Sequence, residues 1–312
     1  MRESLITAFG IARSLRIYYG DKTRRGAMDA LHARFLRSGN LAFDVGAHVG
    51  DRTASFRRLG ARAVAIEPQP ALARTLRILF ALDRGVAVEP LAVGRSEGEI
   101  EIKLNPPNPT VATASGEFIH AAAGTPGWAD QRWTRAIRVP VTTLDVLIAR
   151  HGEPRFVKID VEGFEDEVVA GLSRPLPALS LEFTTIQRDV ALRAIARLET
   201  LGRYAFNAAL GESQQLVHAA PLDARAIAQW VESLPATVNS GDVYAALDPA
   251  TLRSSDEQAT PAGAGAAWKA VPIGLLNRYR PDRCATYTVG AMGLEAAPRA
   301  QSGGNHDRPD CL

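Results

Sequence analysis

Cysteine is scarce, and the only two, Cys284 and Cys311, lie near the C-terminus of the 312-residue chain. Their number and position exclude a disulfide-stapled fold and a cysteine-rich zinc module. An excess of one charge is also missing, because 36 Lys and Arg against 34 Asp and Glu leave a formal net charge of +2. That is too little to indicate nucleic-acid binding. No apolar run is long enough to span a bilayer. We therefore expect a soluble, cytoplasmic protein with no membrane span and no nucleic-acid partner.

Composition divides the chain into regions. Residues 1–40 show the apolar periodicity of two helices, and residues 41–247 alternate strand and helix patterns. Within the latter, residues 105–135 are rich in Pro, Ala, Gly and Thr and predict a loop insertion. From residue 248 to 312 the chain shifts to Ala, Pro, Gly and Ser, which favours a disordered or loosely docked tail. Local docking is predicted for 272–276 and 287–294.

Short apolar runs alternate with helical patterns through the middle of the chain, which predicts an α/β fold with a parallel sheet covered on both faces. Ligands of such sheets bind at the carboxyl ends of the strands. The predicted strands are 41–45, 63–66, 86–93, 99–104, 137–144, 156–160, 178–183, 204–210, 215–218 and 242–247, and the predicted helices are 52–59, 70–82, 165–172 and 189–201.

The first strand runs into a glycine turn, in the segment Phe43-Asp-Val-Gly-Ala-His-Val-Gly50. Gly46 permits a sharp turn, and Gly50 would let a ligand approach the backbone closely. Thr53 falls in the first turn of the following helix, where its hydroxyl either caps that helix or meets a ligand carboxylate. Asp44 is the acid that precedes the turn.

A second acid, Glu67, ends the next strand, where a carboxylate can accept both hydroxyls of a ribose. The turn is not the dinucleotide pattern G-x-G-x-x-G, since His48 replaces the second glycine. Asp44 would also oppose a pyrophosphate but suit a cationic ligand. These features favour a nucleoside with an amino-acid arm, S-adenosylmethionine, over the alternative, a nicotinamide-dependent oxidoreductase.

Six segments carry a resemblance to a known family: Asp44-Val-Gly-Ala-His-Val-Gly50, Ala65-Ile-Glu-Pro-Gln-Pro70, Leu91-Ala-Val-Gly94, Val141-Thr-Thr-Leu-Asp145, Phe156-Val-Lys-Ile-Asp-Val-Glu-Gly-Phe-Glu165 and Asp242-Val-Tyr-Ala245. With them, residues 40–247 resemble the FkbM family of class I S-adenosylmethionine-dependent methyltransferases. The family more often has Asn at the position of His48. The resemblance implies a Rossmann-like, mostly parallel seven-stranded sheet with an antiparallel last hairpin and helices on both faces.

The resemblance also implies which residues surround the cofactor. It places Asp44, Gly46 and Gly50 around the methionine part of S-adenosylmethionine, in the turn that carries His48. It implies that Glu67 binds the ribose and that the loop that contains Ala92 lies near the adenine.

The implied reaction is O-methylation of a hydroxyl on a saccharide or natural product. Lys158, Asp160 and Glu162 would then stand where methyl group and acceptor meet, with Asp160 or Glu162 as the general base. His120 and His151 are the next candidates for that base.

Several alternatives remain open. The domain is either an enzyme or a catalytically silent cofactor-binding domain. Trp128 and Trp133 either line an acceptor pocket or pin the insertion. We predict no metal site, although Asp160, Glu162 and Glu182 could in principle gather Mg²⁺. The pattern does not predict the oligomeric state.

Overall fold

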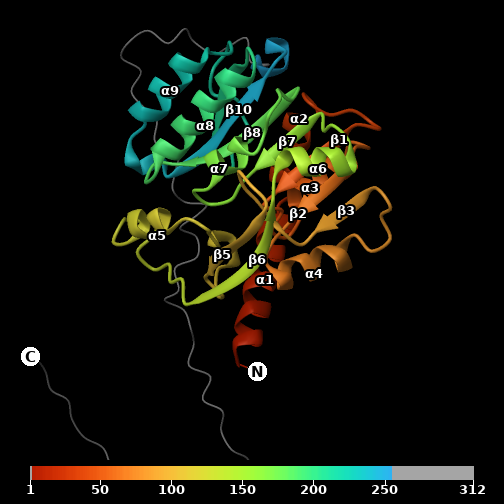
Figure 1. Cartoon of the computed structure of the whole chain (residues 1–312), viewed down its shortest axis with the longest axis vertical. Coiled ribbons are helices and arrows are strands. Elements are labelled where there is room, and N and C mark those ends of the chain that lie inside the picture. The colour runs from red at the N-terminus through yellow and green to blue at the C-terminus, as the bar shows by residue number, and fades with distance from the viewer. Residues whose placement is uncertain (1, 255–312) are drawn as a thin grey trace, which may run out of the picture. The chain divides into compact units, whose positions relative to one another are not determined.

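A computed structural model describes residues 2–254 of the chain, with side chains from residue 5. The tail 255–312, with its two predicted docking segments and both cysteines, lies outside the described residues. A seven-stranded sheet forms the centre (Figure 1). Its strands, in spatial order, are β3 (Val86–Glu89), β2 (Arg62–Ile66), β1 (Leu41–Val45), β7 (Phe156–Ile159), β8 (Ala178–Thr184), β10 (Ser240–Ala246) and β9 (Ala205–Leu210).

Pairing in this sheet is parallel from β3 to β8, and β10 is antiparallel to both β8 and β9. This confirms the predicted fold class, including the antiparallel last hairpin. The parallel strands read as continuous apolar runs because both of their faces are buried: every residue of β1 is buried, including Asp44.

Helices cover both faces of the sheet. One face packs against α6 (Leu144–His151), α7 (Glu165–Ala170), α8 (Arg188–Leu201) and α9 (Ala224–Ser233), and Figure 1 shows α8 and α9 beside β8 and β10. The other face carries α2 (Lys22–His32), α3 (Asp51–Arg58) and α4 (Pro70–Leu79). On that side the rings of Phe35 and Phe156 stack at 4.8 Å, and Phe56 meets Phe156 edge-on.

The first helix, α1 (Arg2–Gly20), packs on the loops at the carboxyl edge of the sheet rather than on its faces. The Tyr19 hydroxyl donates to the Val49 carbonyl at 3.0 Å. Gly10 allows a close approach, since a Cβ there would lie 2.8 Å from the Pro106 carbonyl oxygen. Between residues 2 and 254, no helix combines the length and apolarity needed to cross a membrane.

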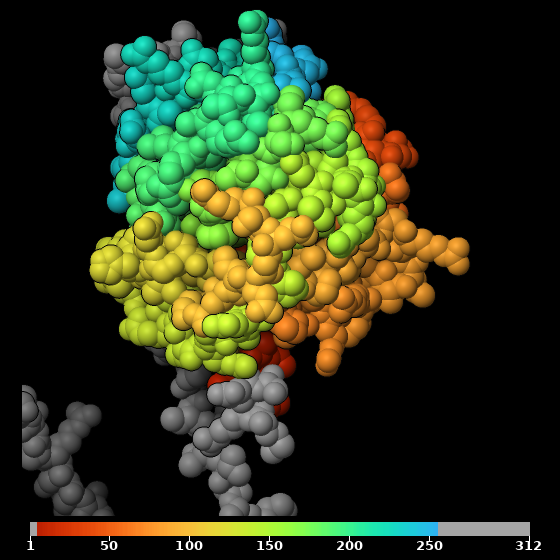
Figure 2. Space-filling view, in the orientation of Figure 1, coloured from red at the N-terminus to blue at the C-terminus, as the bar shows by residue number. Residues whose placement is uncertain are grey.

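A second sheet departs from the prediction. We expected one strand over 86–93, but the chain leaves the main sheet after Glu89, because Pro90 has no N–H to continue the ladder. Residues Ala92–Val93 instead form β4, in a three-stranded sheet with β6 (Arg135–Thr142) and β5 (Gly98–Leu104). In Figure 2 this part of the chain, orange to yellow-green, lies against the green surface of the larger sheet and its helices.

The insertion 105–135 is more ordered than the predicted loop. It contains a short 3₁₀ turn, η1 (Pro109–Val111), and α5 (Gly116–Ala122). Trp128 donates from Nε1 to the Asn239 side chain at 2.8 Å, and Trp133 donates to the Val111 carbonyl at 2.7 Å. Both tryptophans pack around Phe118, so in this structure they pin the insertion.

The fold continues past residue 247. A 3₁₀ turn, η3 (Pro249–Leu252), returns to the α2 side, where Leu252 is fully buried. Asn207 donates from Nδ2 to the Leu252 carbonyl, and Arg34 donates from Nε to the Thr251 carbonyl, both at 2.8 Å. Residues 215–218, predicted as a strand, have no strand assignment.

We predict that Leu252→Ala lowers the free energy of unfolding by about 2–5 kcal/mol, the usual cost of removing a buried leucine side chain. Chemical denaturation of the full chain measures this. Leu82→Ala, at a position that is almost fully exposed, is the matched control and should change stability by less than about 1 kcal/mol. Equal effects of the two substitutions would show that η3 is not part of the core.

Candidate functional site

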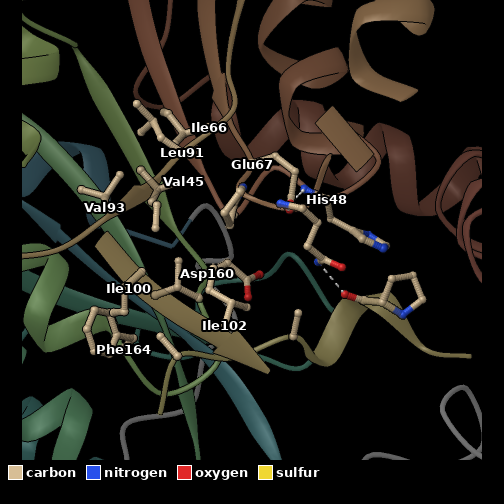
Figure 3. A pocket seen from close by; sticks show the side chains of 18 of the residues that line it. Val45, His48, Ile66, Glu67, Leu91, Val93, Ile100, Ile102, Asp160 and Phe164 are labelled. Carbon is tan, nitrogen blue, oxygen red and sulfur yellow. Dashed lines mark hydrogen bonds between the residues drawn. The ribbon is translucent and has the colours of Figure 1, made fainter. Parts of the chain in front are cut away.

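A cleft opens at the carboxyl ends of β1, β2 and β7, between the main sheet and the three-stranded sheet (Figure 3). It encloses about 600 Å³ of empty space, part of it open to solvent. It is lined by Val45, Gly46, His48, Ile66, Glu67, Pro68, Gln69, Leu91, Ala92, Val93, Ile100, Ile102, Pro109, Thr110, Ala112, Ala114, Asp160, Val161 and Phe164.

The turn at Gly46 brings two strand ends together. Its φ is +82°, and a Cβ there would lie 1.8 Å from the Asp160 carbonyl oxygen, so only glycine fits. The N–H groups of Gly46 and Ala47 both donate to the Ile66 carbonyl at 3.0 Å. The turn is thereby tied to β2 on one side and pressed against the end of β7 on the other.

Glu67 is held at one end of the cleft by the backbone. Its Oε2 accepts from the His48 N–H at 2.9 Å, and its Oε1 accepts from the Gln69 N–H at 2.8 Å. Burial raises the pKa of Glu67 to about 7, against the lowering effect of these two bonds. Each oxygen still has a free lone-pair site, so a carboxylate that lines the cleft remains able to accept from a ribose.

His48 lines the cleft in a left-handed conformation, with φ +49°. Its Nε2 lies 3.5 Å from the Thr110 hydroxyl, and its ring meets Tyr18 of α1 edge-on at 5.4 Å. Burial lowers the pKa of His48 to about 4, so the ring is neutral at physiological pH. Through Tyr18, α1 forms part of the surroundings of the site.

Three of the predicted cofactor residues lie outside the cleft lining. Asp44 Oδ2 accepts from the Thr53 N–H at 2.9 Å and from the Thr53 hydroxyl at 2.6 Å, so these two residues hold the start of α3 to β1. Gly50, at φ +78°, allows a close approach of α4: a Cβ there would lie 2.6 Å from a methyl carbon of Leu76. The close neighbour of Gly50 in this structure is therefore α4, and the approach of a ligand to Gly50 stays a prediction.

Apolar side chains form one wall of the cleft. Ala92 and Leu91 lie in this wall together with Ile100 and Ile102 of β5. Figure 3 shows the apolar groups on one side, Glu67 and His48 on the other, and Asp160 between them. The sequence analysis missed the β5 residues, although the alternation Glu99-Ile-Glu-Ile-Lys-Leu104 is the pattern of a strand with one covered face.

A buried ammonium group stands behind Asp160. Lys158 donates from Nζ to Asp242 Oδ1 at 2.8 Å and lies 3.2 Å from Asp160 Oδ2, with its side chain only 3% exposed. Burial disfavours its charge, but these two carboxylates outweigh burial and raise the pKa of Lys158. Burial likewise opposes ionisation of Asp160, yet the Lys158 ammonium holds its pKa below the usual range. Asp160 is therefore the ionised acid of the cleft, and Lys158 holds it in place.

The other predicted catalytic groups lie away from the cleft. Glu162 is buried behind it, and burial followed by the charge of Asp160 raises its pKa well above the usual value. His151 contacts Glu89 with Nε2 at 2.8 Å, and His120 is exposed on α5. The structure adds Asp242 beside Lys158, and it places Glu182, so far named only as a possible metal ligand, close to Asp160.

A family model described as "Methyltransferase FkbM domain" matches residues 44–202 of the chain, a range that contains the whole cleft lining. The chain belongs to the FkbM methyltransferase family. Membership confirms S-adenosylmethionine, the methyl donor expected from the sequence, as the cofactor. Within the FkbM domain, the match begins at Asp44 and ends at Gly202, directly after α8.

Solved structures similar to this FkbM chain share little of its sequence, and two of them are methyltransferases. An O-methyltransferase from Bacillus cereus, in complex with SAH, is 12% identical over 77% of this chain and 90% of its own, with a TM-score of 0.38. Precorrin-6Y C5,15-methyltransferase from Geobacter metallireducens is 15% identical over 70% and 85%, with a TM-score of 0.36. Aeropyrum pernix fibrillarin, with bound S-adenosyl-L-methionine, is 12% identical over 67% of each chain, with a TM-score of 0.36. No curated protein matches the chain.

The raised pKa of Glu67 predicts a pH-dependent loss of stability. The unfolded chain releases this proton near pH 4.5 and the folded chain near pH 7. The stabilising effect of the protonated group is therefore complete below pH 4.5 and lost as the pH rises through 7. Relative to Glu67→Gln, the free energy of unfolding of the unmodified protein should fall by at most about 3 kcal/mol across this window.

Denaturant titrations at several pH values measure this difference. Glu101→Gln, on the exposed side of β5, removes a carboxylate without that burial and is the control. A difference between the unmodified protein and Glu67→Gln that does not change with pH would contradict the assignment.

Proposed function

We propose that this FkbM-family enzyme transfers a methyl group from S-adenosylmethionine to a hydroxyl oxygen of a small acceptor, either a saccharide or a natural product. The observation that carries the proposal is the cleft with two different acids. Glu67, whose oxygens are fixed by backbone N–H groups, lies at one end, and the ionised Asp160 lies across the Gly46 turn from it. The cleft can therefore hold the cofactor with one acid, Glu67, and take a proton from the acceptor with the other, Asp160.

The lining of the cleft suits the two ends of a nucleoside. Glu67 would accept the ribose hydroxyls, and the apolar wall of Leu91, Ala92, Ile100 and Ile102 would contact the base. When bound, the cofactor supplies an electrophilic methyl group on a sulfonium, which an acceptor oxygen displaces in line. Holding the two reactants in alignment is worth about 7–11 kcal/mol at best.

Asp160 is the residue we assign as the general base. Its carboxylate would take the proton from the acceptor hydroxyl, a contribution of about 10²- to 10⁴-fold in rate. Glu162 is the weaker candidate, since its raised pKa keeps it protonated at neutral pH and it does not line the cleft. Lys158 acts through Asp160 and is a positioning residue.

The proposed acceptor is a small molecule rather than a nucleic acid. The near-neutral net charge of +2 supports this, because nucleic-acid binding relies on many basic side chains. An oxidoreductase is not favoured by the family of the chain. A catalytically silent cofactor-binding domain would bind S-adenosylmethionine equally well but would show no turnover.

Calorimetric titration with S-adenosylhomocysteine tests the cofactor site, with NAD as the parallel ligand. We expect binding of the first only. Glu67→Ala should weaken it about 10- to 100-fold, since hydrogen bonds to a charged group contribute about 1.5–3 kcal/mol. Glu89→Ala is the matched control, because Glu89 ends the neighbouring strand β3 outside the cleft. Unchanged affinity in Glu67→Ala would place the cofactor elsewhere.

Turnover tests the base once a panel of hydroxylated acceptors has identified a substrate. Asp160→Asn should lower kcat by about 10²- to 10⁴-fold while leaving S-adenosylhomocysteine affinity within a few-fold. Asp166→Asn, in a surface ion pair with Arg193, should leave both unchanged. A carbon-13-labelled methyl donor and the NMR shift of the product separate O- from N-methylation. An N-methyl product, or full activity of Asp160→Asn, would refute the proposed chemistry.

A further inference from the structure

Three carboxylates converge behind the cleft. Asp160 and Glu162 belong to the loop after β7, and Glu182 belongs to the neighbouring strand β8. One oxygen from each lies within 4.8 Å of the other two. We call Asp160, Glu162 and Glu182 the acidic cluster.

Two oxygens of the acidic cluster are buried without a hydrogen-bond partner. These are Glu162 Oε2 and Glu182 Oε2, and the Glu162 residue is only 7% exposed. Burying an unpaired carboxyl oxygen is costly. A ligand that supplies positive charge or hydrogen-bond donors would remove that cost.

The available ammonium group is already committed. Lys158 donates to Asp242 and to the Ile159 carbonyl, and its contact with the acidic cluster is with Asp160 alone. Neither Glu162 nor Glu182 has an ion pair with any residue between 5 and 254. Among the described residues, no basic side chain therefore forms an ion pair with either glutamate.

A neutral oxygen outside the acidic cluster points to the same place. Gln187 Oε1 is buried and unpartnered, and the Gln187 side chain lines the same narrow space as Glu182. Gly163 leaves room for it, since a Cβ there would lie 2.4 Å from that oxygen. An amide oxygen together with carboxylates is the donor set of a hard cation.

We propose that the acidic cluster, with Gln187 beside it, binds a divalent cation of the Mg²⁺ and Mn²⁺ class. Metal–oxygen distances of about 2.1 Å in an octahedron place neighbouring ligand oxygens about 3 Å apart and opposite ones about 4 Å apart. The observed span of 4.8 Å closes to this with small side-chain rotations. The loop that carries two of the ligands is fixed, because the Thr113 hydroxyl donates to the Glu162 carbonyl at 2.6 Å.

The proposal that the cation binds does not depend on the proposed reaction. Asp160 alone belongs both to the acidic cluster and to the cleft lining. Any effect of the cation on turnover therefore rests on the proposed function, whereas binding itself does not.

Electron paramagnetic resonance of Mn²⁺ tests the site directly. The full chain is stripped with chelator, desalted and titrated with MnCl₂. We expect one bound Mn²⁺ per chain that MgCl₂ displaces and that KCl at equal ionic strength does not. Glu162→Gln and Glu182→Gln should each weaken Mn²⁺ binding by at least about tenfold. Glu117→Gln, on the exposed side of α5, should bind like the unmodified protein.

Thermal melting and S-adenosylhomocysteine binding are measured on the same samples. The two Gln substitutions lie on different elements, so one folded variant is enough for the comparison. No displaceable Mn²⁺ in the unmodified protein, or full affinity in a folded variant, overturns the cation site. If either result occurs while S-adenosylhomocysteine still binds, the cation site is refuted and the proposed function stands. If Mn²⁺ binds as expected but S-adenosylhomocysteine does not, the proposed function is refuted and the cation site stands.

Discussion

The buried ammonium of Lys158 is the interaction on which the rest of the site depends. Lys158 lies in β7 at the centre of the sheet, level with Asp44 of β1 and Ser180 of β8. It joins Asp242 of the antiparallel hairpin to Asp160 of the cleft. Without it, two partly or fully buried carboxylates would lose their counter-charge, and breaking such a pair typically costs about 3–5 kcal/mol. One charge thus fixes the end of β7 and keeps its acid ionised.

Much of the sheet was predictable from the sequence, because a strand buried on both faces has a composition that few other elements share. Strands 41–45 and 156–160 agree with the structure to within a residue. The missed helices are α5, α6 and α9, and length alone does not explain this, because α9 has 10 residues, as many as the predicted α4. The apolar residues of α6 directly follow β6, so one run of sequence contains two elements. The predicted strand 215–218 has the pattern but lacks a partner: its Val217 N–H donates to the Ala208 carbonyl without forming a ladder.

Position along a strand was sufficient to place part of the predicted site beside the cleft, and the roles of these residues stay predictions. Gly46, Glu67 and Asp160 follow or end parallel strands, and all three line the cleft. Position along a strand was not sufficient where a neighbouring residue decides what a side chain contacts. The Thr53 hydroxyl is used by Asp44, and the space above Gly50 is filled by Leu76, which no local pattern reveals. The wall from β5 was unpredictable because its place depends on a second sheet.

The two sides of the cleft belong to different sheets. Its floor is formed by the ends of β1, β2 and β7 of the main sheet, and its apolar wall comes from the three-stranded sheet of β4, β5 and β6. Among the described residues, no strand ladder joins β4, β5 or β6 to the strands of the main sheet. Residues of the wall can therefore be substituted, or the wall can shift by a small amount, without breaking the hydrogen bonds between the strands of the main sheet. A fold arranged in this way can change the apolar wall, which we propose contacts the base of the cofactor, while the main sheet that carries Glu67 and Asp160 is inherited unchanged.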